Sequence, residues 1–183
     1  KAFIPYIMAG DPTIDKTGEF VKILEDCGAD IIELGIPFSD PLADGPTIQR
    51  AAQRALKGGT TLHSVLDLVA RLRRDTLIPI VLMTYYNPVF RYGEEKFVAD
   101  ASDAGVDGTI IPDLPPDEAD DFIRFAGKKR LDTIFLLAPT STEERIRKVS
   151  RASRGFIYYV SITGITGSEL SMAPEIGAQV DLI

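Results

Sequence analysis

The sequence predicts an α/β domain of repeated βα units, and a (β/α)8 TIM barrel is its preferred form. Short apolar runs alternate with longer segments of helical period, which is typical of βα units and a parallel sheet. The runs are apolar almost without interruption, which indicates strands buried on both faces. The first turn after a strand reads AGDPT from Ala9 rather than GxGxxG, so an open dinucleotide-binding sheet is disfavoured.

The strand-like runs are separated by segments with recognisable helix ends. The runs are FIPYIMA from Phe3, DIIELGI from Asp30, PIVLMTYY from Pro79, DGTIIPD from Asp107, DTIFLLAP from Asp132 and FIYYVSI from Phe156. Helices are expected over Ile14 to Cys27, around Ile48 to Leu56, around Leu62 to Arg73, over Glu94 to Ala104, and from Pro115. Two of these helices fall between the second and third strands, so one βα unit carries an insertion.

The number of runs limits how much of a barrel the chain can build. Six strands are too few to close an eight-stranded barrel. No linker or low-complexity segment divides the sequence. We therefore expect residues 1–183 to form a single TIM-barrel domain that is truncated before strands 7 and 8.

Composition and charge argue against several classes of function. The chain has 20 Lys and Arg against 27 Asp and Glu, a net charge of −7, so nucleic acid and anionic membrane are poor partners. No apolar run approaches the roughly 20 residues that cross a bilayer. The single cysteine, Cys27, permits no intrachain disulfide and favours a cytoplasmic setting. With His63 as the only histidine, neither a Cys/His metal cluster nor a Ser/His/Asp set is present.

Two carboxylates of the second βα unit are the candidates for chemistry. Glu33 lies inside the second strand, where alternation places it on one face with Ile31 and Gly35. If that face lines a barrel, Glu33 points inward and has a raised pKa or a partner. Asp44 lies in the proline-rich loop after this strand, and the pair can supply an acid and a base. The alternatives are a salt-bridged or rim-exposed glutamate and an ordinary turn.

Three further features of the sequence indicate a functional role less strongly. Asp113 ends the fourth strand and can cap the next helix, anchor a loop or contact substrate. Tyr158 and Tyr159 are neighbours on the sixth strand and must face opposite ways, so one of them can reach the barrel mouth. The Gly-rich segment 163–168 has backbone N–H groups that can approach an anion, although a lid would have the same composition.

At these residues the chain resembles the tryptophan synthase alpha subunit family. The motifs are IELGIPFSDPLADGPTIQ from Ile32, YYNPVF from Tyr85, IPDLPPDEA from Ile111, LLAPTSTEERI from Leu136 and FIYYVSITGITG from Phe156. The resemblance implies a TIM barrel that cleaves indole-3-glycerol phosphate by a retro-aldol reaction into indole and glyceraldehyde 3-phosphate. It implies that this reaction uses neither a metal nor an organic cofactor.

The resemblance also assigns roles to individual residues. Glu33 corresponds to the general acid/base, and Asp44 to the carboxylate that holds the indole N–H and stabilises positive charge on the ring. The implied substrate-binding residues are Tyr6, Met83, Tyr85 and Tyr158 around the indole, and Thr166 and Gly167 in the loop that closes over the phosphate.

The implied partner is the pyridoxal-phosphate-dependent beta subunit, in an alpha2beta2 heterotetramer that receives the indole. Asp40, Pro41 and the segment from Asn87 to Phe90 resemble the contact regions. In the family, strands 7 and 8 and their loops supply most of the phosphate site, so we expect residues 1–183 alone to lose both rate and affinity. The alternatives are another cofactor-free phosphosugar barrel lyase and a non-catalytic barrel subunit that binds and activates a partner enzyme.

Overall fold

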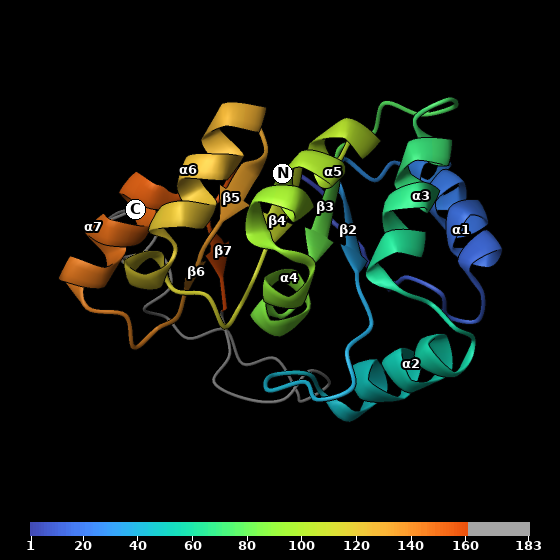
Figure 1. The fold of residues 1–183 in the computed structure, drawn as a ribbon, viewed down its shortest axis with the longest axis horizontal. Helices are drawn as coiled ribbons and strands as arrows, with labels where there is room; N and C mark the ends of the chain where they lie inside the picture. Colours follow the sequence, from blue (N-terminus) through green and yellow to red (C-terminus); the bar gives the residue numbers. More distant parts are fainter. Residues whose placement is uncertain (161–183) are drawn as a thin grey trace.

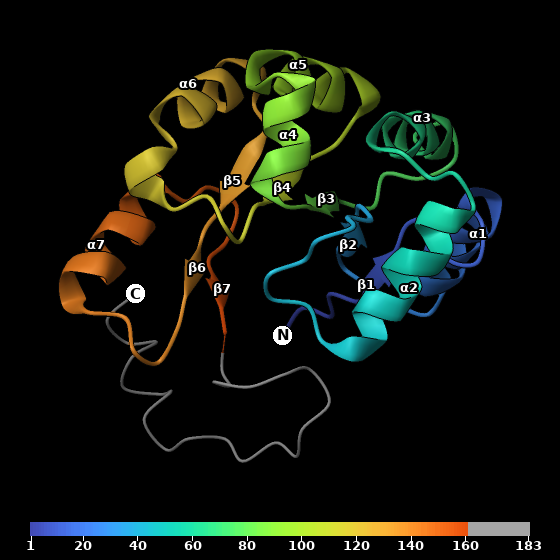
Figure 2. The same cartoon turned by 60° about the horizontal axis from the view of Figure 1, so that its bottom comes forward.

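The computed structural model describes residues 1–160, which form parallel strands with helices packed outside them (Figure 1). The strands are β1 (Tyr6–Met8), β2 (Ile32–Gly35), β3 (Ile80–Met83), β4 (Gly108–Ile110), β5 (Asp132–Ile134), β6 (Leu136–Leu137) and β7 (Tyr158–Tyr159). They pair in the order β1-β2-β3-β4-β5 in one sheet and β6-β7 in a second, and every pair is parallel. Figure 2 shows the strands along an arc.

The helices follow the strands in the βα order that the sequence predicts. They are α1 (Ile14–Asp26), α2 (Pro46–Lys57), α3 (Leu62–Leu72), α4 (Tyr86–Tyr92), α5 (Glu94–Ala104), α6 (Asp120–Lys129) and α7 (Glu143–Ala152), with a 3-10 turn η1 (Pro116–Glu118). Along the outside of the arc, α1 packs against α3, α3 against α5, and α5 against α6 (Figure 2). None of the helices described in residues 1–160 has the length and apolarity needed to span a membrane.

Strand register determines which side chains face the inside of the arc. Register partners on adjacent strands point to the same face of a sheet. Tyr6, Glu33 and Val81 are partners across β1, β2 and β3, and together they face inward. Leu34 and Leu82 are also partners, and they are buried in the layer between strands and helices. A separate inner cluster contains buried Val81, Ile110 and Ile134.

Helix α2 is the predicted insertion, and it does not lie in the outer layer. It begins with Pro46 at its first turn, where a missing N–H costs nothing, and ends at Gly58. Its buried alanines, Ala51, Ala52 and Ala55, pack with Met8 at the end of β1. The small side chains let the helix approach the strand end closely, so α2 closes the side of the arc next to β1.

Two sequence predictions about elements need correction. The run from Asp132 is broken at Phe135 into β5 and β6, each belonging to a different sheet. The run from Pro79 was expected to remain extended through Tyr86, but β3 ends at Met83 and Tyr86 begins α4. This helix starts there because the Asp113 carboxylate accepts a hydrogen bond from the Tyr86 N–H at 2.8 Å.

Because six strands are too few to close an eight-stranded barrel, the first and sixth predicted strands should not pair with each other, and this is confirmed. Within the described residues, β1 pairs only with β2, and β7 pairs only with β6. The six runs therefore do not close into a six-stranded barrel.

Two neighbouring threonines of the outer layer, Thr109 and Thr133, allow a test of how a buried hydroxyl group affects stability with and without a hydrogen bond. They are register partners and are 2% and 3% exposed. Thr133 donates to the Ala152 carbonyl, whereas the Thr109 hydroxyl has no hydrogen-bond partner among the described residues. We expect Thr109→Val to raise the unfolding free energy by about 1 kcal/mol and Thr133→Val to lower it by about 1 kcal/mol. Urea unfolding measures both, and equal effects of the two substitutions would contradict this account.

Candidate active site

A cavity of about 280 Å³ lies at the C-terminal ends of the strands. Its volume is near the lower end of the range for small-molecule sites. Its lining comes from β1, β2, β3, β6 and β7, from the start of α2, and from the segments after β2, β4 and β7: Tyr6, Glu33, Ala43, Asp44, Ile48, Met83, Pro112, Leu136, Tyr158 and Val160. In barrels of this class the C-terminal end of the strands is where chemistry takes place.

Glu33 is a buried acid without a hydrogen-bonding partner among the described side chains. Its side chain faces the cavity, and the residue is 5% exposed. Burial raises the pKa of Glu33 from its ordinary value of 4.5 to about 7. Near neutral pH the group therefore exists in both protonated and ionised forms. A carboxyl in this condition can give a proton in one step and take a proton in another.

Tyr6 reaches the cavity because residue 35 is a glycine. A Cβ atom at Gly35 would lie 2.1 Å from the Tyr6 hydroxyl oxygen, far inside van der Waals contact. The missing side chain lets the tyrosine lean across the end of β2. Burial, and then the nearby charges of Asp44 and Glu33, raise the pKa of Tyr6. Its phenol therefore stays neutral and can donate a hydrogen bond into the cavity.

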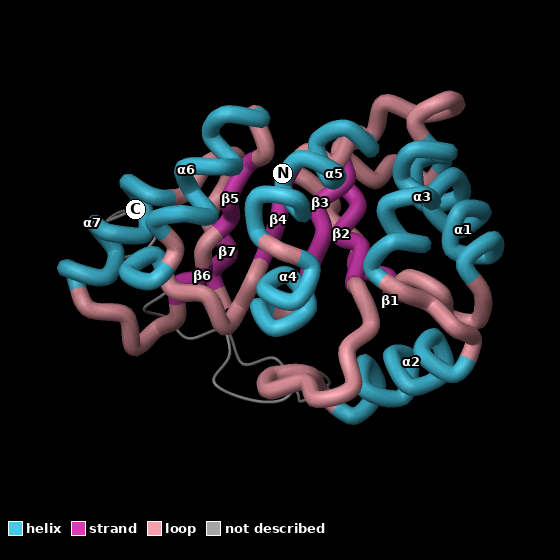
Figure 3. The backbone as a smooth tube through the Cα atoms, in the orientation of Figure 1, coloured by secondary structure: helices cyan, strands magenta, loops and turns pink. Residues whose placement is uncertain are grey.

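Asp44 is held by the long loop between β2 and α2, which runs beside the strand ends (Figure 3). The Gln49 side chain donates to the Asp44 carbonyl oxygen at 2.8 Å and fixes the backbone there. Burial raises the pKa of Asp44, and a hydrogen bond from Tyr85 lowers it. Unlike Glu33, this carboxyl group therefore has a donor that favours its ionised form.

The structure brings most of the predicted site residues together. Met83 and Tyr158 line the same cavity as Glu33 and Asp44. Tyr85 lines a smaller adjoining cavity of about 10 Å³, which also contacts Asp44. The predicted phosphate contacts Thr166 and Gly167 lie outside the described residues.

Asp113 and the predicted partner-contact residues lie outside the cavity lining. Asp113 caps α4, which precedes it in the chain, rather than the helix that follows it. Asp40 and Pro41 occupy the loop after β2, and Asn87 and Phe90 lie on α4. The Ala43 N–H donates to the Tyr85 hydroxyl oxygen at 3.0 Å, so this loop and the start of α4 are in direct contact.

Sequence reasoning missed half of the cavity lining. The missed residues are Ala43, Ile48, Pro112, Leu136 and Val160, all of them apolar. An apolar side chain at a cavity wall has the same sequence pattern as one in the core, so no local signal distinguishes them. The described residues also contain no group of three or more His, Cys, Asp or Glu side chains that could hold a metal ion.

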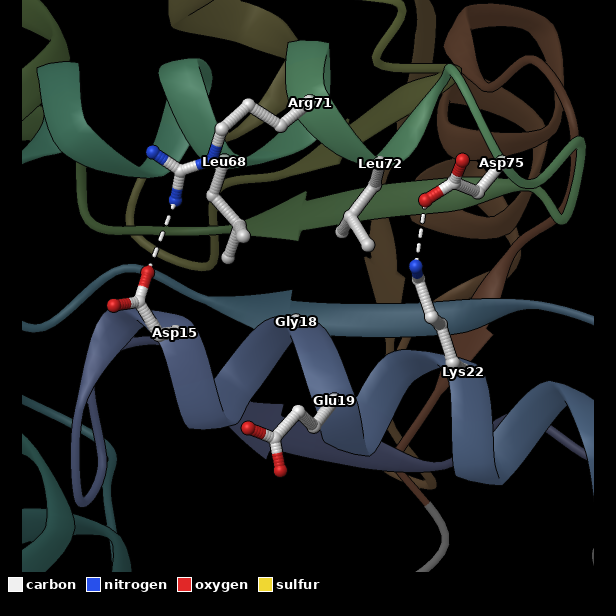
Figure 4. A pocket seen from close by; sticks show the side chains of 8 residues that line it. All are labelled: Asp15, Gly18, Glu19, Lys22, Leu68, Arg71, Leu72 and Asp75. Carbon is white, nitrogen blue, oxygen red and sulfur yellow. Dashed lines mark hydrogen bonds and ion pairs between the residues drawn. The ribbon is translucent and has the colours of Figure 1, made fainter.

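A second hollow, between α1 and α3 on the outer surface, has a different character (Figure 4). Gly18, Leu68 and Leu72 line it together with charged side chains. Across it Lys22 pairs with Asp75 at 2.6 Å, and Arg71 pairs with Asp15 at 3.6 Å. These four charged side chains pair with one another and Glu19 pairs with Lys16, so the charged groups that line the hollow already have partners. The cavity at the strand ends, which encloses the buried Glu33, is the candidate active site.

Comparison with known proteins decides the family. The whole chain, residues 1–183, matches the family described as Tryptophan synthase alpha chain. The chain belongs to this family. The tryptophan synthase alpha chain of Geotalea uraniireducens (strain Rf4) is 56% identical over 183 residues, which are 100% of this chain and 68% of the relative. That of Geobacter sulfurreducens is 54% identical and matches 100% of this chain and 69% of its own length.

Solved structures give the same result for the fold. A structure of Mycobacterium tuberculosis tryptophan synthase has a TM-score of 0.91 and 43% identity, over 98% of this chain and 70% of that one. A tryptophan synthase complex from Pyrococcus furiosus has a TM-score of 0.83 and 45% identity, over 86% of this chain and 65% of that one. The tryptophan synthase alpha chain fold is a TIM barrel, so the predicted fold class is confirmed. The chain spans about two thirds of the length of these proteins.

The raised pKa of Glu33 predicts how stability depends on pH. Between pH 4.5 and about 7 the folded chain keeps a proton on Glu33 that the unfolded chain has lost. Stability therefore falls as pH rises through this window, by about 3 kcal/mol in total, and the loss is complete above the folded pKa. In Glu33→Gln this contribution is absent, so the variant should be more stable than the natural protein at pH 8. Denaturant unfolding at several pH values measures this, and parallel stability curves for the two proteins would contradict it.

Proposed function

We propose that this chain catalyses the retro-aldol cleavage of indole-3-glycerol phosphate to indole and glyceraldehyde 3-phosphate, as part of tryptophan biosynthesis. The observation that carries the proposal is the pair Glu33 and Asp44 on one cavity, with different environments for their carboxyl groups. Membership of the tryptophan synthase alpha chain family supports it.

The proposed steps require two things of the protein: proton transfer by Glu33 and charge stabilisation by Asp44. The protonated Glu33 carboxyl gives its proton to the indole ring carbon that carries the glycerol chain, and the ring nitrogen becomes positively charged. The ionised Asp44 accepts a hydrogen bond from that N–H and stabilises the charge. Glu33, now a carboxylate, takes the proton from the adjacent glycerol hydroxyl. The C–C bond breaks, its electron pair returns to the ring, and indole and the aldehyde are formed.

Each carboxyl group is suited to its proposed role by its surroundings. Glu33 must change protonation state during the reaction, and burial places its pKa near 7, where both states are accessible. Asp44 must stay ionised, and the Tyr85 hydrogen bond favours that form. Tyr6, Met83 and Tyr158 line the space between strand ends where the indole would lie. We propose that Thr166 and Gly167 contact the phosphate.

No cofactor enters these steps, and we propose that the alpha reaction needs none. We assign pyridoxal phosphate to the partner beta subunit alone. We also propose a cytoplasmic location, where a free, exposed thiol such as that of Cys27 persists in reduced form.

The partner we propose is the tryptophan synthase beta subunit, in an alpha2beta2 complex. Solved relatives include the tryptophan synthase a2b2 complex from Pyrococcus furiosus. On this chain the loop holding Asp40 and Pro41 exposes 80% of Leu42, and the α4 segment exposes 65% of Phe90. The loop contacts the start of α4, so large apolar side chains are exposed on two neighbouring segments, which supports an interaction site there. This surface adjoins the cavity, because Asp44 belongs to the same loop.

Loss of either carboxylate should remove the lyase activity of the protein at its natural length. We expect Glu33→Gln to lower kcat for indole release by about 10²- to 10⁴-fold, because proton transfer is lost. We expect Asp44→Asn to lower it by about 10²- to 10³-fold, because charge stabilisation is lost. The matched controls Glu19→Gln and Asp75→Asn lie on the outer surface and should retain full activity. Indole production near the natural rate in either cavity variant would favour the non-catalytic subunit.

Two exposed leucines provide a test of the partner surface. Leu42 lies in the loop after β2, and Leu77, 91% exposed, precedes β3 at the opposite end of the strands. We expect Leu42→Ala to weaken binding of the beta subunit about tenfold, because a buried apolar contact is lost. Leu77→Ala should leave the affinity unchanged. Calorimetric titration with the beta subunit measures both, and equal affinities for the two variants would refute the proposed surface.

A further inference from the structure

Tyr85 lies behind Asp44 rather than in the main cavity. It follows β3 as the N-cap residue of α4, with an extended backbone. Its side chain points to the loop after β2, where its ring lies 5.5 Å from that of Phe38 between centroids. The residue is 6% exposed and contacts the small cavity next to Asp44. Tyr85 is therefore placed to contact the loop rather than the ligand.

The Tyr85 hydroxyl group interacts with two consecutive residues of this loop. It accepts a hydrogen bond from the Ala43 N–H at 3.0 Å. Its own O–H acts as a donor toward the Asp44 carboxylate, which lowers the pKa of Asp44. A phenol has one donor and two acceptor positions, so both interactions can form at once. Burial and the Asp44 charge contribute to raising the pKa of Tyr85 to about 12, so the hydroxyl keeps its proton.

No other described side chain does this for Asp44. Gln49 holds only the backbone carbonyl of Asp44, at 2.8 Å. The carboxylate itself has Tyr85 as its side-chain donor. Among the described side chains, the Tyr85 hydroxyl group is thus the donor that opposes the effect of burial on the pKa of Asp44.

We infer that Tyr85 is a positioning residue, whose hydroxyl holds the loop at Ala43 and aims the Asp44 carboxylate into the cavity. This inference rests on the proposed lyase function and deepens it. Tyr85 acts through Asp44, whereas the family resemblance places it among the residues around the indole. A residue that touched only the ring would act through its apolar faces, and its hydroxyl would be dispensable.

The two roles differ in their effect on the pH profile. Asp44 must be ionised for the reaction, so its pKa sets an acid limb in kcat/KM. Loss of the Tyr85 donor raises the pKa of Asp44, because burial then acts without the opposing hydrogen bond. The acid limb should therefore move to higher pH in Tyr85→Phe. A residue that only shapes the cavity would lower the whole profile without moving the limb.

The experiment measures kcat/KM for indole release across pH in the protein at its natural length. For Tyr85→Phe we expect the acid limb to rise by about one pH unit, so that activity on that limb falls about tenfold and the defect shrinks at higher pH. The control is Tyr86→Phe. The Tyr86 hydroxyl donates a hydrogen bond to the Glu94 carboxylate at 3.0 Å, and neither residue lines the cavity. Its profile should match that of the natural protein.

A second variant applies if Tyr85→Phe does not fold. Incorporation of 3-fluorotyrosine at position 85 preserves the shape of the ring and makes the hydroxyl a stronger donor. We expect it to move the acid limb to lower pH, opposite to the effect of Tyr85→Phe. The inference is overturned if the natural protein is active and the acid limb stays in place in both variants. It is also overturned if the limb stays in place in the fluorinated variant alone. A natural protein that releases no indole refutes the proposed function instead.

Discussion

The parallel pairing of β1, β2 and β3 is the constraint on which the site depends. Register places Tyr6, Glu33 and Val81 on one row, and that row faces inward because the alternate row packs against the helices. A shift of one residue would send Glu33 into the apolar outer layer. The backbone hydrogen bonds that set the strand register therefore also place the Glu33 carboxyl group inside the arc at the strand ends. Apolar side chains that pack on both faces of the sheet stabilise this register.

Enclosure alone does not make two carboxyl groups different, and the loop after β2 provides the difference. Glu33 belongs to a strand whose backbone groups pair with the neighbouring strands, and within residues 1–160 no donor bonds to its side chain. Asp44 belongs to a loop that crosses the start of α4, where a tyrosine hydroxyl is available. One acid thus remains easy to protonate, and the other is kept closer to its ionised form. The proposed difference in role between the two carboxyl groups thus follows from their locations, Glu33 on a strand and Asp44 in a loop.

Much of this arrangement could be predicted from sequence, for identifiable reasons. The strands were found because apolar runs persist locally, and Glu33 was found because a charged residue interrupts such a run. The start of α4 was missed because it depends on Asp113, which is 27 residues away in the chain. The bond between Tyr85 and Ala43 spans 42 positions and is equally invisible to local patterns. The roles of Glu33 and Asp44 stay predictions, because the location of a side chain in a cavity does not test what it does in a reaction.

The bare backbone at Gly35 has a consequence for attempts to redesign this cavity. Tyr6 occupies the space that any larger residue at that position would claim, so the two sites cannot vary independently. A library that randomises position 35 alone would mostly collect molecules with a displaced tyrosine. Shortening Tyr6 first would leave room for larger residues at position 35 and let new shapes of the wall be sampled. The order in which these two residues change would thus limit which ligands the cavity could come to accept.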